Sequence, residues 1–320
     1  MSSLKKMFQE ALDISREGLG KFYPACAVGI GDFYGLYEKY FECADNSFFD
    51  VASITKPIVG SNLVLKLDLL NNEVAELLPE PKFDYDRKMK IKVADILKHS
   101  AGFVAHYPLF ESVENMEPSY QTRSIIMNEA WNLQLGEGNT IVYSDIGFIV
   151  LTYYIENKAK KRVDELFYSY MNFRDMFYLK DISDKSKVVP TSYTTRVHDE
   201  NSYYMMGVSL HAGLFSNITG LAEAIRYIIQ NFKEMFLEKG MNEIHGGERF
   251  FLGFDSFVHN GKILFGHLGF TGCGFWIDFQ SETYAIFLSN RVFPSTGRNP
   301  SQAPEGFMKI RKRIWQLLCE

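Results

Sequence analysis

The sequence predicts an α/β (α+β) fold, in which helices flank an antiparallel sheet built from both chain ends and a mostly helical segment is inserted between them. Segments rich in Val, Ile, Tyr and Phe, separated by turn residues, lie near both ends, whereas helical spacing of apolar residues dominates the middle. We therefore expect a sheet domain from residues 1–70 and 195–320, a helical domain from residues 71–194, and an active site at their interface.

The first elements follow from the spacing of apolar residues and from turn signals. Residues 1–19 place apolar side chains at helical intervals between charges, which predicts a docked amphipathic helix and not a signal peptide. Residues 25–30 and 34–41 predict a hairpin around Gly31 and Asp32. Residues 55–70 then predict a helix that Asn71 and Asn72 close.

The remaining elements divide into central helices and a C-terminal meander. Helical patterns cover residues 93–98, 124–133, 146–156, 162–173 and 221–237. Strands are predicted at residues 251–258, 262–268, 273–279 and 283–288, and a last helix at residues 305–318. Asn260-Gly261 joins the first two of these strands and is a strong signal for a two-residue hairpin turn.

Charge and cysteine usage exclude several classes of protein. The formal net charge is -5 and the basic residues are scattered, so a nucleic-acid partner is not expected. No apolar run approaches the roughly 18 residues of a membrane-spanning helix. The four cysteines lie far apart and include no Cys-x-x-Cys pair, which argues against a zinc site and against a disulfide framework. A reducing cytoplasm is therefore the expected compartment, although the sequence leaves a Cys26–Cys273 disulfide open.

Ser53 and Lys56 are the first candidates for chemistry. A spacing of three residues places both side chains on one helical face, where the amine can reach the hydroxyl. The same spacing recurs at Ser2/Lys5 and Ser3/Lys6, so spacing alone is weak evidence. Ser53 differs because it follows a strand-like segment and opens a helix, whose N-terminal amide groups stabilise negative charge. The alternative is a helix-capping serine beside a solvated lysine.

Tyr143 is the candidate that could exchange a proton with Ser53. It lies on a loop directly before an apolar helix, as part of Tyr143-Ser144-Asp145, whereas its competitor Tyr170 lies within an amphipathic helix. A cleft is more easily formed at the loop position. Taken alone, Tyr143 is also compatible with a core aromatic residue whose hydroxyl is hydrogen-bonded.

A third element would be a strand edge that presents backbone N–H groups to a substrate. Of three His-x-Gly segments, beginning at His211, His245 and His267, only the last falls on a predicted strand. Gly269 would then allow a substrate to approach the backbone closely. The residues 198–200, His-Asp-Glu, resemble a metal-ligand cluster, but adjacent residues on an irregular segment rarely converge on one ion, so no metal is assigned.

These three elements, in this order, resemble the Ser-x-x-Lys, Tyr-x-Asn and Lys-Thr-Gly motifs of the serine β-lactamase-like (penicillin-binding protein) superfamily, which includes class C β-lactamases, DD-peptidases and esterases. The similarity extends to residues 50–57, 98–102, 143–148, 211–216 and 266–272. The resemblance implies the β-lactamase/transpeptidase-like fold and a serine hydrolase without a cofactor. It implies Ser53 as nucleophile, Lys56 and Tyr143 as its proton-handling partners, and Ser53 and Phe270 as oxyanion-hole donors.

Two departures from the family pattern concern charge. Asp145 stands where the family often has Asn, and a carboxylate beside Lys56 should hold the amine cationic, so we predict that Tyr143 is the base. His267 replaces the Lys of Lys-Thr-Gly, and Leu268 replaces its Thr. A neutral imidazole binds a substrate carboxylate less well than an ammonium does, so efficient β-lactam hydrolysis is not expected.

The sub-group with Tyr-Ser-Asp and His-Ala-Gly-Leu-Phe-Ser looks similar to cell-wall-recycling amidases. We therefore expect an acyl-enzyme on Ser53 that acts on amide or ester bonds of muropeptide-like small molecules or short peptides in the cytoplasm, without an obligate protein partner. The alternatives are a carboxylesterase of the same fold, a weak β-lactamase or DD-carboxypeptidase, and a non-catalytic ligand-binding or assembly module. The presence of all three motif residues argues against the module.

Overall fold

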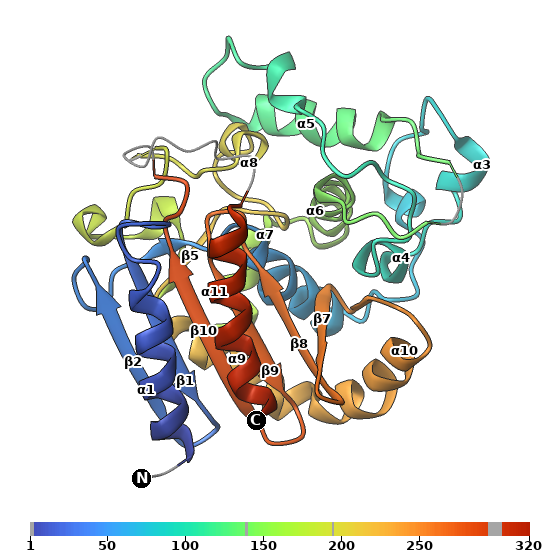
Figure 1. Cartoon of the computed structure of the whole chain (residues 1–320). Coiled ribbons are helices and arrows are strands. Elements are labelled where there is room, and N and C mark those ends of the chain that lie inside the picture. The colour runs from blue at the N-terminus through green and yellow to red at the C-terminus, as the bar shows by residue number, and fades with distance from the viewer. Residues whose placement is uncertain (1–2, 138–139, 194, 294–302) are drawn as a thin grey trace.

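The computed structural model describes residues 3–137, 140–193, 195–293 and 303–320. A seven-stranded antiparallel sheet is its central element, with the strand order β2-β1-β10-β9-β8-β7-β6 (Figure 1). Strands from the two chain ends meet where β1 pairs with β10, as the sequence predicts. The bounds are β1 Cys26–Gly31, β2 Leu36–Phe41, β6 Phe250–Phe251, β7 Phe254–His259, β8 Lys262–Leu268, β9 Gly274–Asp278 and β10 Thr283–Ser289.

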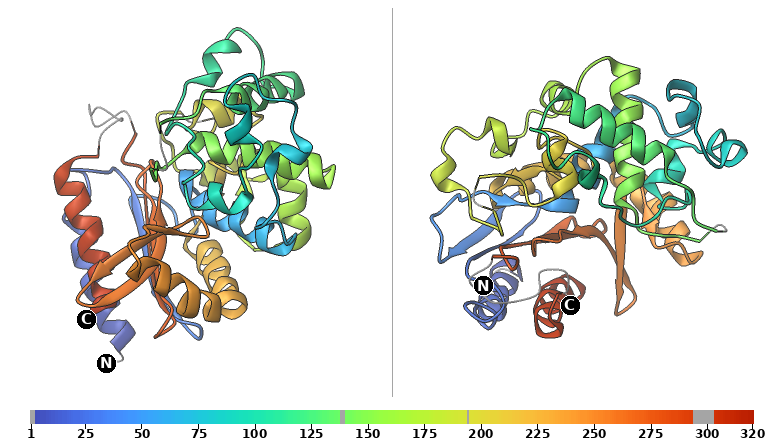
Figure 2. Two further views of the ribbon diagram at one scale, coloured as in Figure 1. Left: turned by 90° about the vertical axis from the view of Figure 1, so that its right-hand side faces the viewer. Right: turned by 90° about the horizontal axis from the view of Figure 1, so that it is seen from above.

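Helices cover both faces of the sheet. Because successive side chains of a strand point to opposite faces, they pack into two different hydrophobic clusters. Helices α1 (Ser3–Arg16) and α11 (Glu305–Gln316) lie side by side on one face, and α9 (Ile218–Met235) lies on the other (Figure 2). In β10, Ala285 and Phe287 pack with the first pair of helices, whereas Ile286 and Leu288 belong to the larger core that includes α9. This alternation accounts for the continuously apolar central strands.

The segment between β2 and α9 is mainly helical and packs above the sheet (Figures 1 and 2). One cluster of buried apolar side chains runs from the sheet and α9 into α6, and the proposed division into two domains stays a prediction. The α-helices here and before β6 are α2 Asn62–Lys66, α3 Tyr85–Lys88, α4 Val93–Leu97, α5 Tyr120–Asn132, α6 Asp145–Ala159, α7 Val163–Tyr170, α8 Glu200–Tyr204 and α10 Met241–His245. Short 3₁₀ turns cover Val74–Leu77, Leu109–Ser112, Leu179–Asp181, Lys185–Lys187 and Leu317–Cys319.

Three local features differ from the predicted elements. The predicted strand at residues 251–258 is broken after Phe251, because Leu252 and Gly253 adopt positive φ (49° and 76°) and form a tight turn between β6 and β7. The predicted helix at residues 55–70 is a π-helix, Lys56–Ser61, followed by the short α2. A second sheet has the order β3-β5-β4 and is formed by Phe49–Asp50, Leu214–Ser216 and Met176–Tyr178. The sequence indicated the strand-like segment before Ser53 but not its two partner strands, since such short strands show no periodicity.

The predicted Asn260-Gly261 hairpin turn is confirmed: both residues have positive φ, and β7 pairs with β8 across them. All four cysteines are free thiols, so Cys26 and Cys273 do not form the disulfide that the sequence left open. Within the described ranges, no helix combines the length and apolar character that crossing a bilayer requires.

Candidate active site

The chain reaches Ser53 through a strained turn after β3. Ala52 has a φ of 48°, which is unfavourable for a residue with a Cβ. The buried Asp50 carboxylate stabilises this turn by accepting hydrogen bonds from the Ala52 N–H at 2.9 Å and the His198 N–H at 2.9 Å. Burial raises the pKa of Asp50 to about 6, although both amides favour its charged form. Ser53 follows within a 3₁₀ turn, Ala52–Ile54, and lines a cavity.

Lys56 opens the π-helix and lies beneath Ser53 with no exposed surface. Its ammonium donates to Ser53 Oγ at 2.9 Å, to Asp145 Oδ1 at 2.6 Å and to the His211 carbonyl at 3.1 Å. These acceptors satisfy all three N–H donors of a charged lysine. The structure therefore brings Ser53, Lys56 and Asp145 together from two distant parts of the chain.

Asp145 controls the charge of Lys56. Burial lowers the pKa of Lys56, but the adjacent Asp145 carboxylate outweighs burial, so the pKa lies above its ordinary value. For Asp145, burial raises the pKa, while Lys56 and then His106 lower it, leaving it well below the usual range. The direction of this shift agrees with the sequence-based expectation that Asp145 holds Lys56 in its cationic form.

Tyr143 lies beside this ion pair, immediately before α6. The Lys56 ammonium is 4.9 Å from the centroid of its ring. Its hydroxyl is buried and, within the described part of the chain, has no partner in hydrogen-bonding geometry. Burial raises the pKa of Tyr143, and the nearby Lys56 and Ser53 offset part of this rise. At rest, the phenol is therefore protonated beside a lysine cation.

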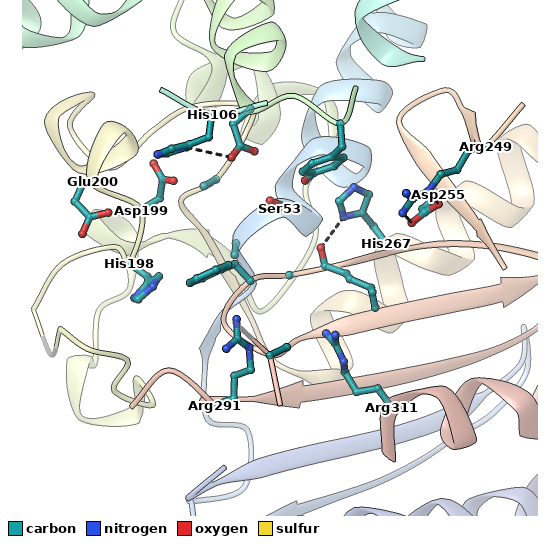
Figure 3. Close-up of a pocket in the computed structure, with 18 residues that line it drawn as sticks. Ser53, His106, His198, Asp199, Glu200, Arg249, Asp255, His267, Arg291 and Arg311 are labelled. Carbon is teal, nitrogen blue, oxygen red and sulfur yellow. Dashed lines mark hydrogen bonds and ion pairs between the residues drawn. The ribbon is translucent and has the colours of Figure 1, made fainter. Parts of the chain in front are cut away.

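The end of β8 forms the opposite wall of the site (Figure 3). A Cβ on Gly269 would lie 2.5 Å from the Val51 carbonyl oxygen, so only glycine allows this strand end to pack against the chain leading to Ser53. The Gly269 N–H donates to the Cys273 carbonyl at 2.8 Å. Phe270 follows with an N–H that has no acceptor among the described residues, as an oxyanion donor requires.

His267 lies on β8 and is buried within this wall. Its Nδ1–H donates to the Leu268 carbonyl at 2.8 Å, which leaves Nε2 as an acceptor without a partner in the described structure. Burial, followed by the Lys56 charge, lowers the pKa of His267 to about 4. The imidazole is therefore neutral at pH 7, as predicted for the residue that replaces a lysine.

This low pKa makes stability dependent on pH. Below the ordinary histidine value of 6.5 the unfolded chain takes up the proton before the folded protein does, so acid weakens the fold until about pH 4. Between pH 7 and pH 4, we expect the free energy of unfolding of the wild type to fall by about 3 kcal/mol more than that of the His267→Gln variant, because the variant lacks the titrating imidazole. Urea unfolding at several pH values measures this difference. Equal pH dependence of the two proteins would contradict the assignment.

The cavity in front of Ser53 has a volume of about 670 Å³. Sequence reasoning missed several of its polar residues. His106 Nδ1 lies 3.7 Å from Asp145 Oδ2, and this contact raises the pKa of His106 despite burial. The further residues that were missed and that line the cavity are the hydrogen-bonded pair Arg249 and Asp255, together with Arg291 and Arg311. None of these residues belongs to a motif with recognisable spacing.

The residues that the sequence offered as alternatives to the site residues lie away from Ser53 or are held by other hydrogen bonds and ring contacts. His211 is held between Ser209 Oγ and Asp199 Oδ1, each at 2.8 Å, and its carbonyl binds Lys56. His245 is exposed at the end of α10, and Tyr170 lies at the end of α7 beside a separate pocket. His198 stacks on Phe270 with ring centroids 5.5 Å apart. In the part of the chain with described coordinates, no three His, Cys, Asp or Glu residues form a group that could hold a metal ion.

Comparisons with known proteins identify a family and a fold. The model of the Beta-lactamase family matches residues 35–303. A protein assigned as a D-alanyl-D-alanine carboxypeptidase in Salmonella enteritidis is 23% identical over 82% of this chain and 73% of its own length. The hydrolase EstCE1, which has promiscuous acyltransferase activity, has a TM-score of 0.71 at 16% identity and 98% coverage of both chains. D-amino acid amidase from Ochrobactrum anthropi has a TM-score of 0.71 at 14% identity and 99% coverage of both chains.

Proposed function

The chain belongs to the β-lactamase family and is a serine hydrolase, and on this premise we propose that Ser53 forms an acyl-enzyme with amide or ester substrates derived from the cell wall. The observation that carries the proposal is the hydrogen bond from Lys56 to Ser53 Oγ at 2.9 Å, made by a lysine that is also paired with Asp145. A helix-capping serine beside a solvated lysine would not have a fully buried ammonium.

In the proposed mechanism, Tyr143 first loses its phenolic proton to solvent. Ser53 Oγ then attacks the carbonyl carbon while its own proton passes to the Tyr143 phenolate. The cationic Lys56 stabilises this phenolate. The Ser53 and Phe270 N–H groups bind the oxyanion. The bond from carbon to the leaving nitrogen or oxygen then breaks, and the leaving group takes the proton from Tyr143. Water attacks the acyl-enzyme in the same way, which releases the acid and Ser53.

The substrate class is proposed to be muropeptide-like short peptides. Relatives assigned as D-alanyl-D-alanine carboxypeptidases support it, and the cavity of about 670 Å³ has the size of sites that hold compact ligands. The four free thiols are compatible with a reducing compartment, so we propose that the reaction takes place on wall fragments in the cytoplasm. Low β-lactam turnover is proposed because His267 is neutral.

The proposal is tested by intact-mass measurement after incubation with nitrophenyl esters, β-lactams and muropeptides. We expect an acyl adduct on the peptide that contains Ser53 with the esters and muropeptides, and slow or no acylation by β-lactams. Turnover of esters without release of peptide from muropeptides would instead identify a carboxylesterase. If no substrate forms an adduct and a fluorophosphonate probe also fails to label the protein, the chain is a non-catalytic module.

A further inference from the structure

His99 is a buried residue, just after the end of α4, that the proposed mechanism does not use. Only 3% of its surface is exposed, and it is not among the residues that line the cavity. Helix α4 packs against α6, so the turn that contains His99 lies beside the segment that leads into α6 (Figure 1). That segment carries Tyr143.

His99 holds the backbone on both sides of Tyr143. Its carbonyl oxygen accepts a hydrogen bond from the Val142 N–H at 3.0 Å, and its ring Nδ1 accepts one from the Ser144 N–H at 3.0 Å. These amide groups belong to the residues immediately before and after Tyr143. A single residue therefore fixes the chain at two points, with the phenol between them.

The imidazole of His99 also packs on the side chain of Tyr143. The two ring centroids are 4.7 Å apart. The imidazole is itself enclosed by Phe250 of β6, with ring centroids 4.6 Å apart, and by Phe148 of α6, with ring centroids 5.4 Å apart. Because packing restricts the imidazole, it provides a fixed surface for the phenol ring.

The hydrogen bond to Ser144 requires a neutral imidazole. An amide N–H can only donate, so Nδ1 must accept with its lone pair and the ring proton lies on Nε2. Burial lowers the pKa of His99 well below its ordinary value, and the charge of Lys56 lowers it further. His99 is therefore neutral at pH 7, and Nδ1 stays available as an acceptor.

The backbone conformation of His99 allows its carbonyl and its ring to reach the same segment. Its φ is 57°, in the left-handed region that most residues with a Cβ avoid. Histidine and asparagine adopt this region more often than most other residues, and both carry a hydrogen-bond acceptor bonded to Cγ. Asparagine is therefore the replacement that preserves both properties.

The position of the Tyr143 hydroxyl depends on these contacts. Within the described ranges the hydroxyl has no partner in hydrogen-bonding geometry, so it is held through the backbone and the ring. Proton transfer between the phenol and Ser53 requires their oxygen atoms to come within about 3 Å of each other. A displacement of about 1 Å can lower a rate by about 10²-fold.

We propose that His99 is a positioning residue, which holds residues 142–144 through its carbonyl and Nδ1 and so keeps the Tyr143 hydroxyl within reach of Ser53. The inference rests on the proposed function, because it assumes that Tyr143 exchanges a proton with Ser53. His99 does not touch the reacting atoms. Its contribution to the rate should therefore disappear when the Tyr143 hydroxyl is removed.

The first test compares His99→Leu with His99→Asn by steady-state turnover of a nitrophenyl ester. Leucine has a similar size but no acceptor, so we expect His99→Leu to lower kcat by about 10-fold or more while KM changes by less than about 3-fold. Asparagine restores the acceptor, so the kcat of His99→Asn should exceed that of His99→Leu by about 3-fold or more. Equal losses in the two variants, or a wild-type kcat in His99→Leu, would overturn the proposal.

A double-mutant cycle with Tyr143→Phe separates positioning from a general effect on the fold. If His99 acts through the phenol, His99→Leu should change kcat by less than about 2-fold in the Tyr143→Phe background. A loss of the same size in both backgrounds would show a purely structural role. If His99→Leu does not fold, His99→Gln, which moves the acceptor one bond further from the backbone, replaces it in both comparisons.

Ser100→Ala is the matched control, because Ser100 follows His99 and its hydroxyl donates to the Asp95 carbonyl at 3.3 Å within the same turn. This bond does not involve residues 142–144, so kcat should stay at the wild-type value. Thermal unfolding of each variant shows whether its fold is intact.

Hydrogen exchange distinguishes failure of this inference from failure of the proposed function. The Ser144 amide should exchange about 5-fold or more faster in His99→Leu than in the wild type, and more slowly again in His99→Asn. If the wild type forms no acyl adduct, the proposed function and the catalytic role of His99 both fail, even where the exchange rates confirm the hydrogen bond. If the wild type turns over esters and His99→Leu leaves kcat and the exchange of Ser144 unchanged, only the positioning role is refuted.

Discussion

The Ser53→Ala variant is expected to lose esterase and amidase activity by a factor of about 10⁴ or more, because the proposed acyl-enzyme cannot form without the hydroxyl. The fold should persist. Lys56 loses one acceptor but keeps Asp145 at 2.6 Å and the His211 carbonyl at 3.1 Å, so no buried charge is left without a partner. Steady-state turnover of a nitrophenyl ester and fluorophosphonate labelling measure the loss, and thermal unfolding measures the stability.

Ser186→Ala provides the control for Ser53→Ala, since Ser186 is an exposed serine bonded to Asp184 and distant in sequence from the motifs. It should retain wild-type turnover and labelling. Retention of labelling by the Ser53→Ala protein would show that another residue is the nucleophile. That result would remove the basis of the proposed mechanism even though the family and fold would stand.

Ser53, Lys56 and Tyr143 could be predicted from the sequence because each lies at or next to the start of a helix. Ser53 and Lys56 are three residues apart at the start of a helical segment, and Tyr143 directly precedes α6. Such positions leave a local signal of spacing, turn residues and helix starts. The roles of these residues stay predictions until the variants are measured, but the sequence correctly anticipated that Asp145 would meet Lys56.

The other residues of the cavity are brought together by packing between elements that are distant in the sequence. The spacing of residues within one element does not predict such contacts. Arg311 occurs in an amphipathic helix, where a charged residue normally belongs to the solvent-exposed face, and only the packing of α11 on the sheet turns it toward the cavity. His106 and Arg291 likewise lie outside recognisable motifs. Short-range conformations also escaped prediction, as the Leu252-Gly253 turn and the π-helix after Thr55 show.

The Tyr143→Phe variant is expected to lose about 10²- to 10⁴-fold in kcat, the usual contribution of a general base, while its free energy of unfolding stays within about 1 kcal/mol of the wild type. The stability should hardly change because the buried hydroxyl has no hydrogen-bond partner in the described structure. The Tyr143 hydroxyl lies beside Lys56 and Ser53, which both lower its pKa, and this position suits a group that exchanges a proton with Ser53. Steady-state kinetics and urea unfolding provide the two measurements.

The pH profile separates Tyr143 from Lys56 as the base. Because the pKa of Tyr143 is raised, its phenolate fraction increases with pH across the neutral and alkaline range, and wild-type kcat/KM should rise accordingly. In Tyr143→Phe this rise should disappear. A rise that survives in the variant would assign the proton transfer to Lys56, whose pKa is raised as well. Since Asp145 holds Lys56 cationic, a neutral amine would form only at high pH, and we therefore expect the phenol to be the group that titrates in the reaction.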